Sequence, residues 1–69
     1  MKVIFLNYQT TDGTSEPIFE TQIKQIPKIG DGVSFPFEED IHYAEVKHIV
    51  HCFNLQSKFT HIEIELSDF

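Results

Sequence analysis

The sequence predicts an all-β protein whose five strands close into one small barrel. Apolar residues recur at alternate positions in several short segments, which is the pattern of strands with one buried face. Asp, Gly, Pro and Asn residues separate these segments at short intervals, as turns do. A chain of 69 residues has room for one core, to which seven Phe and two Tyr residues can contribute. We therefore expect a single domain over residues 1–69.

The first expected strand is Lys2–Gln9, which is rich in β-branched and aromatic residues. It runs into Thr10–Thr14, a segment with an Asp-Gly pair at its centre. An Asp-Gly pair between two apolar runs is a strong signal for a hairpin turn. We therefore expect the next segment to pair with this strand.

The second segment, Pro17–Ile26, fits two periodicities. Phe19, Thr21 and Ile23 alternate as on a strand, whereas Phe19 and Ile23 also fit the stripe of a helix. The hairpin signal before it and Pro27 after it favour a strand. A helix here would instead make the fold α+β.

The middle of the chain predicts a turn, a short strand and a second turn. Ile26–Asp31 contains Pro27 and Gly30, of which the glycine can adopt a positive φ. The expected strand Gly32–Phe37 alternates apolar residues on one face. The acidic run from Glu38 to Asp40 then provides a solvated reversal.

The clearest strands are Ile41–Phe53 and Phe59–Leu66, joined by a loop over residues 54–58. The first is long enough to bend between both halves of a small barrel. Unbroken alternation along both strands predicts that Val50 lies opposite Ile62. This register places Cys52 in the core.

The same register predicts two pairs on the outer face, His51 with His61 and Phe53 with Phe59. Glu63 lies diagonally from His51, so these groups offer an alternative function as a small-ligand or metal site. Two neutral imidazoles on a solvated face are the simpler and favoured interpretation of the pair, and we expect no bound metal and no cofactor.

The segments Ile26–Val33 (IPKIGDGV) and Tyr43–His51 (YAEVKHIVH) resemble small bacterial and phage SH3-like β-barrel proteins. The resemblance covers Pro27 to Val50. It implies a five-stranded SH3-like barrel that serves as a binding module. KOW-type RNA-binding domains share the Pro-x-x-Gly-Asp-x-Val turn, but this chain departs from them in its acidity.

The charge of the chain disfavours nucleic-acid binding. It has 11 acidic and 5 basic residues, a formal net charge of -6, whereas binding to phosphates depends on Lys and Arg. An acidic phage-type inhibitor that mimics nucleic acid toward a basic partner is a third alternative.

Cysteine usage and hydropathy predict a cytoplasmic protein without a membrane contact. Cys52 is the only cysteine, so no internal disulfide can form. The apolar run at the start of the sequence stops at Asn7 and lacks the length and cleavage site of a signal peptide. No segment approaches the 18 apolar residues of a membrane span.

The sequence does not predict an enzyme. It contains no phosphate-binding glycine loop, no nucleophile elbow and no H-E-x-x-H zinc motif. His48 and His51 form an H-x-x-H, but residues three apart on a strand point to opposite faces.

The best candidate for function is an aromatic surface on the last two strands. Aromatic and apolar residues that remain on an outer face mark protein contacts. We therefore predict a non-enzymatic interaction module that binds itself or a protein partner through these strands. The candidate partner-binding residues are Tyr43, Ile49, His51, Phe53, Phe59 and His61.

Overall fold

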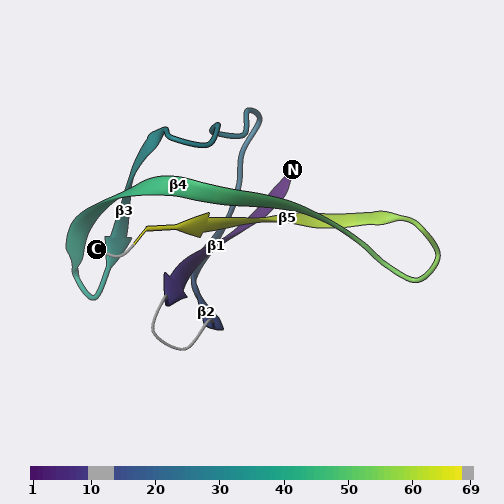
Figure 1. Ribbon diagram of the computed structural model, residues 1–69, viewed down its shortest axis with the longest axis horizontal. Coiled ribbons are helices and arrows are strands. Elements are labelled where there is room, and N and C mark those ends of the chain that lie inside the picture. Colours follow the sequence, from purple (N-terminus) through teal and green to yellow (C-terminus); the bar gives the residue numbers. More distant parts are fainter. Residues whose placement is uncertain (10–13, 68–69) are drawn as a thin grey trace.

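The computed structural model describes residues 1–9 and 14–67, and this part of the chain is built from strands without a helix (Figure 1). It therefore holds no helix that could cross a membrane. The all-β prediction is confirmed, and the α+β alternative is wrong. The strands are β1 (Lys2–Gln9), β2 (Thr14–Gln22), β3 (Gly32–Phe37), β4 (Asp40–Phe53) and β5 (Phe59–Leu66).

The five strands form one curled sheet, a half-barrel, in the order β2-β1-β5-β4-β3. Neighbouring strands are antiparallel except β1 and β5, which are parallel. The edge strands are β2 and β3, and their side chains meet where Phe19 stacks on Phe35 with ring centroids 5.6 Å apart. Aromatic packing therefore draws the two edges together over the core.

The concave face of the sheet holds the core. Val3 and Phe5 of β1 alternate inward, and the parallel pairing sets them beside Ile62 and Ile64 of β5. Burying one aliphatic side chain contributes about 1.5–3 kcal/mol, so this face supplies most of the stability. The buried cluster is completed by Phe35, Ala44, Val46 and Leu66.

Strand β2 is shifted toward the N-terminus relative to the predicted segment Pro17–Ile26. It ends at Gln22, and the Ile23 N–H then donates to the Met1 carbonyl at 3.0 Å. Ile23 and Ile26 lie outside the strand but still pack against the core. The predicted Asp-Gly turn within residues 10–14 falls almost entirely outside the described residues.

The turn over residues 26–31 is fastened to β4. Gly30 has a φ of 96°, as the sequence predicts, and the Lys28 N–H donates to the Asp31 carboxylate at 2.9 Å. The Gly30 N–H donates to the Val46 carbonyl, and the Val46 N–H donates to the Asp31 carbonyl, each at 2.9 Å. Both the N–H and the carbonyl of Val46 are therefore bonded to this turn and not to β5.

The turn between β3 and β4 consists of Glu38 and Glu39, because Phe37 pairs directly with Asp40. Both glutamates have a positive φ, 52° and 68°. These are the angles of a type I′ turn, which matches the twist of a hairpin and is normally made by Asn-Gly. The sequence predicts the position of this turn but not its backbone conformation.

The pairing of β4 with β5 begins as predicted and then shifts by one residue. Val46 lies opposite Leu66, but the next pair joins His48 to Glu65. Lys47 is therefore an extra residue on β4 and forms a β-bulge. Such an insertion reverses the faces of the residues that follow it.

Beyond this bulge, the inward and outward residues of β4 exchange places relative to the predicted register. Ile49 lies opposite the buried Ile64 and packs against the core. Val50 lies opposite Glu63 and is 43% exposed on the outer face. The predicted pairing of Val50 with Ile62 is wrong, because it assumed unbroken alternation.

A second irregularity near the loop restores the first register. Cys52 lies opposite His61, whereas the next pair is Phe53 with Phe59. Thr60 is therefore the extra residue, this time on β5. The predicted pairing of Phe53 with Phe59 is confirmed, but its predicted place on the outer face is wrong, because the pair lies on the core-side face. The predicted core position of Cys52 is wrong, since this residue is half-buried on the outer face.

Candidate functional site

The β4–β5 hairpin extends beyond the other strands along the longest dimension of the molecule, which measures 37 Å (Figure 1). Its inner face continues the core face outward. Ile49 is half-buried against the core, whereas His51 and Phe53, further out on the same face, are exposed. In the outer half of the hairpin, the residues on the core-side face are therefore exposed to solvent in the described part of the chain.

The loop at the end of the hairpin is held in shape by Asn54. Its side-chain oxygen accepts hydrogen bonds from the backbone N–H groups of Gln56 and Lys58, at 2.9 and 3.0 Å. The Asn54 N–H donates to the Lys58 carbonyl, and Ser57 adopts a φ of 64°. This ordered loop leaves the Leu55 side chain 100% exposed.

Two aromatic rings stand directly behind the loop. Phe53 and Phe59 meet edge to face with centroids 5.8 Å apart, and their exposed fractions are 62% and 44%. We call Phe53, Leu55 and Phe59 the hairpin tip. Three large apolar side chains so close together at a projecting end form a typical contact surface.

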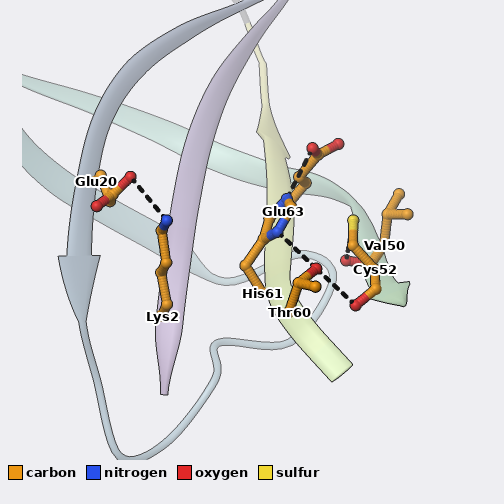
Figure 2. A network of polar contacts seen from close by, with 7 residues as sticks. All are labelled: Lys2, Glu20, Val50, Cys52, Thr60, His61 and Glu63. Atoms are coloured by element: carbon orange, nitrogen blue, oxygen red, sulfur yellow. Dashed lines mark hydrogen bonds and ion pairs between the residues drawn. The ribbon is translucent and has the colours of Figure 1, made fainter. Parts of the chain in front are cut away.

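The outer face of the same hairpin brings together a thiol, an imidazole and a carboxylate (Figure 2). His61 Nε2 lies 3.0 Å from Glu63 Oε2. The Thr60 hydroxyl contacts His61 Nδ1 at 3.0 Å and donates to the Cys52 carbonyl at 3.1 Å. The ligand atoms of Cys52, His61 and Glu63 all lie within 4.8 Å of one another.

Burial raises the pKa of the Cys52 thiol, and the negative charge of the Glu63 carboxylate raises it further. In the absence of a cation, Cys52 is therefore a neutral thiol at pH 7. A neutral thiol is a poor nucleophile, so this cluster does not resemble an activated catalytic cysteine.

A second imidazole–carboxylate pair lies further along the same outer face. His48 Nδ1 is 3.0 Å from Glu65 Oε2, and these residues face each other across the strands. Among the described residues, the cluster on this face that could hold a metal is Cys52, His61 and Glu63, and no thiol joins the pair of His48 and Glu65.

The structure divides the six predicted contact residues between two faces. Tyr43 precedes the Lys47 bulge and lies on the outer face, 75% exposed. His61 is also on the outer face, opposite Cys52, so the predicted His51–His61 pair is wrong and cannot hold a metal. The other members share the core-side face, namely Ile49, His51, Phe53 and Phe59.

The sequence prediction missed Cys52 and Thr60 as members of a polar site. One signal of the bulge was present: Val46 and Ile49 are apolar residues three positions apart, which breaks the two-residue period of a strand. Val50 is also apolar, so Val46 and Val50 together still fit an unbroken alternation in which Ile49 points outward. The sequence alone therefore does not decide between the two registers.

Comparison with known proteins gives no relative: no family model matches the chain, and no curated protein and no solved structure is significantly similar to it.

Proposed function

We propose that this chain is a non-enzymatic interaction module that associates with a second copy of itself through the hairpin tip. The observation that carries the proposal is the exposure of Phe53, Leu55 and Phe59 at the projecting end of β4–β5. Exposed apolar clusters of this kind gain free energy when a partner removes them from water.

Charge favours the tip as the place where two copies meet. Each chain carries a formal net charge of -6, so two copies repel each other over most orientations. Residues 46–62 contain neither Asp nor Glu, and this is the longest stretch of the sequence without an acidic residue. Tip-to-tip contact therefore keeps the carboxylates of the two copies furthest apart.

The size of the tip makes this association weak. Each aromatic side chain can bury about 150–250 Å². Phe53 and Phe59 are already partly buried, at 62% and 44% exposed, so three side chains per copy fall short of the about 1,200–2,000 Å² that stable complexes bury in total. We therefore expect a reversible dimer whose population depends on concentration, with two-fold symmetry because the same surface serves both partners.

The test is sedimentation velocity from about 10 µM to about 1 mM protein, the range in which a weak dimer forms. We expect the weight-average sedimentation coefficient to rise with concentration. Leu55→Asp should abolish the rise without affecting the fold, because Leu55 is fully exposed in a loop.

Ile29→Asp is the matched control, because it introduces the same charge at another exposed apolar residue in a turn. It should leave the concentration dependence unchanged. A strictly monomeric protein throughout the range, or an equal effect of both substitutions, contradicts the proposal. In a monomeric protein, the tip would be free for a different protein partner.

The absence of catalytic activity is part of the same proposal. It is supported by the half-buried position of Cys52, His61 and Glu63 on an open sheet face, which water still reaches. The SH3-like resemblance, the cytoplasmic location and the nucleic-acid mimic stay predictions.

A further inference from the structure

The single hydroxyl proton of Thr60 fixes the tautomer of His61. Thr60 Oγ1 donates this proton to the Cys52 carbonyl at 3.1 Å (Figure 2). The same oxygen lies 3.0 Å from His61 Nδ1, where it can only accept. Nδ1 must therefore carry a proton, which leaves Nε2 as the lone-pair nitrogen of the neutral ring.

That lone pair faces a carboxylate. His61 Nε2 is 3.0 Å from Glu63 Oε2, and both atoms are acceptors when the ring is neutral. Two acceptors at hydrogen-bond distance repel each other unless a cation lies between them. A proton shared between the two atoms, or a metal ion, removes this repulsion.

Cys52 adds a third donor atom to the same point. It lies directly opposite His61 on the neighbouring strand, and Glu63 is two residues from His61 on the same face. The three ligand atoms are within 4.8 Å of one another, so closing to the roughly 3.3–3.7 Å of a tetrahedral zinc site needs rotamer adjustments of about 1 Å. Thiolate, imidazole and carboxylate together suit zinc rather than magnesium or calcium.

The ammonium group of Lys2, on the strand beside β5, pairs with a glutamate outside this cluster. Lys2 lies on β1, beside β5, but its ammonium pairs with Glu20 of β2 at 3.6 Å (Figure 2). A divalent ion would offset the charges of both the Glu63 carboxylate and a Cys52 thiolate. It would favour the deprotonated thiol that metal binding requires.

We propose that Cys52, His61 and Glu63 form a zinc-type metal site, with Cys52 Sγ, His61 Nε2 and a Glu63 carboxylate oxygen as ligands. Thr60 is a positioning residue, because its hydroxyl holds the ring through Nδ1 as the outer hydrogen bond of a metal-bound histidine does. Three protein ligands leave the fourth position for water. This site uses the outer face of the hairpin and does not depend on association through the tip.

The first experiment titrates the reduced, metal-free chain of 69 residues with zinc at pH 7.5 by calorimetry, and with cobalt by absorption spectroscopy. We expect one ion per chain and a thiolate-to-cobalt charge-transfer band. Cys52→Ser should remove that band and weaken zinc binding by more than about a hundredfold, beyond the ten- to hundredfold typical of an outer-shell change. Thr60→Val should preserve the band and weaken binding by about ten- to hundredfold.

His48→Gln is the matched control, because His48 and Glu65 repeat the imidazole–carboxylate contact of 3.0 Å without a thiol. It should bind zinc as the unsubstituted chain does, whereas His61→Gln should not. Circular dichroism and thermal melting of each metal-free variant establish that it is folded. Absence of zinc binding, binding that survives Cys52→Ser, or equal losses in the two histidine variants overturn the proposal.

A second measurement begins with the metal-free chain and then adds zinc. Long-range ¹H–¹⁵N correlation spectra of the neutral imidazole distinguish its two tautomers, and we expect the Nδ1–H form for His61. Zinc should then shift the Nε2 resonance while the proton stays on Nδ1. An Nε2–H tautomer, or a zinc-induced shift at Nδ1 alone, contradicts the proposed ligand atom.

Discussion

Ser57, Glu38 and Glu39 are the non-glycine residues of the described chain that have a positive φ. This region costs an L-residue about 1–2 kcal/mol, because Cβ crowds the carbonyl oxygen. All three residues lie in the turns at the two ends of β4, one turn before the strand and one after it. Conformational strain is thus concentrated in the turns that direct the hairpins.

Ser57→Gly is predicted to stabilise the protein by about 0.5–1 kcal/mol. Glycine removes the cost of the left-handed conformation, although it also gains about 0.5–1 kcal/mol of freedom in the unfolded chain. Gln56→Gly, at the preceding residue without a positive φ, should instead destabilise. Urea unfolding of both variants measures the difference, and a loss of stability in Ser57→Gly contradicts the role of the turn.

The Cys52 thiol provides a second test at the scale of one residue. Burial and the Glu63 carboxylate both raise its pKa, so the folded state favours the neutral thiol. That contribution to stability is present below the ordinary thiol pKa and is lost as the pH rises through the raised value.

We predict slow alkylation of Cys52 by iodoacetamide at pH 8, in the presence of a chelator, compared with the urea-unfolded chain. Glu63→Gln should accelerate the reaction by removing the negative charge, whereas Glu65→Gln should have little effect. Mass spectrometry follows the rate. Equal rates in the folded and unfolded chains would show that folding does not raise the pKa of the Cys52 thiol.

At the scale of the element, β4 is two strands in one. Its first half pairs with β3 and its second half pairs with β5, and the Lys47 bulge directly follows Val46, where the change of partner occurs. At Val46, the backbone exchanges hydrogen bonds with Gly30 and Asp31 while Leu66 lies on the other side. A bulge there bends the strand and re-aims every later side chain.

This register predicts different stability losses for truncation of the adjacent residues Ile49 and Val50. Ile49→Ala is predicted to cost about 2–3 kcal/mol, the lower part of the range for core truncations, since Ile49 is only partly buried. Val50→Ala should cost less than about 1 kcal/mol, because Val50 is exposed on the outer face. Denaturant unfolding of the two variants decides between the registers: unbroken alternation predicts the larger loss at Val50.

At the scale of the whole molecule, the edge strands β2 and β3 are not paired with each other in the sheet, and aromatic side chains fill the space between them. The stacked rings of Phe5, Phe19 and Phe35 run across this opening, with centroid separations of 4.6 and 5.6 Å. A domain of this size has a thin margin of stability, so the aromatic residues that span the gap carry much of it.

The net charge gives a prediction for the molecule as a whole. Two copies of charge -6 repel at long range, and this repulsion is screened by salt. Self-association through the tip should therefore tighten between about 0.05 and about 0.5 M salt, as the Debye screening length falls from about 14 Å to about 4 Å. Sedimentation velocity at both salt concentrations measures this. Weaker association at high salt would indicate an interface held by ion pairs.

Most of the fold could be predicted from local patterns. The bounds of Lys2–Gln9, Gly32–Phe37 and Phe59–Leu66 agree with β1, β3 and β5. Gly30 adopts the positive φ expected of its turn, and Phe53 faces Phe59. Each of these features depends on residues close in sequence or on a single apolar alternation.

The composition of the candidate site could not be predicted, because it depends on two inserted residues. Lys47 and Thr60 each shift the register by one, and neither residue type signals a bulge. Between them, every side chain changes its cross-strand partner, which separates His51 from His61 and brings Cys52 opposite His61. Tertiary hydrogen bonds at Val46, made by a turn 15 or 16 residues earlier, mark where the first shift occurs.

The most direct test of this account is the set of cross-strand backbone NOEs between residues 48–53 and 59–66 in isotopically labelled protein. The bulged register predicts contacts of Ile49 with Ile64 and of Cys52 with His61. Contacts of Val50 with Ile62 and of His51 with His61 would contradict it, and the cluster of Cys52, His61 and Glu63 could then not form.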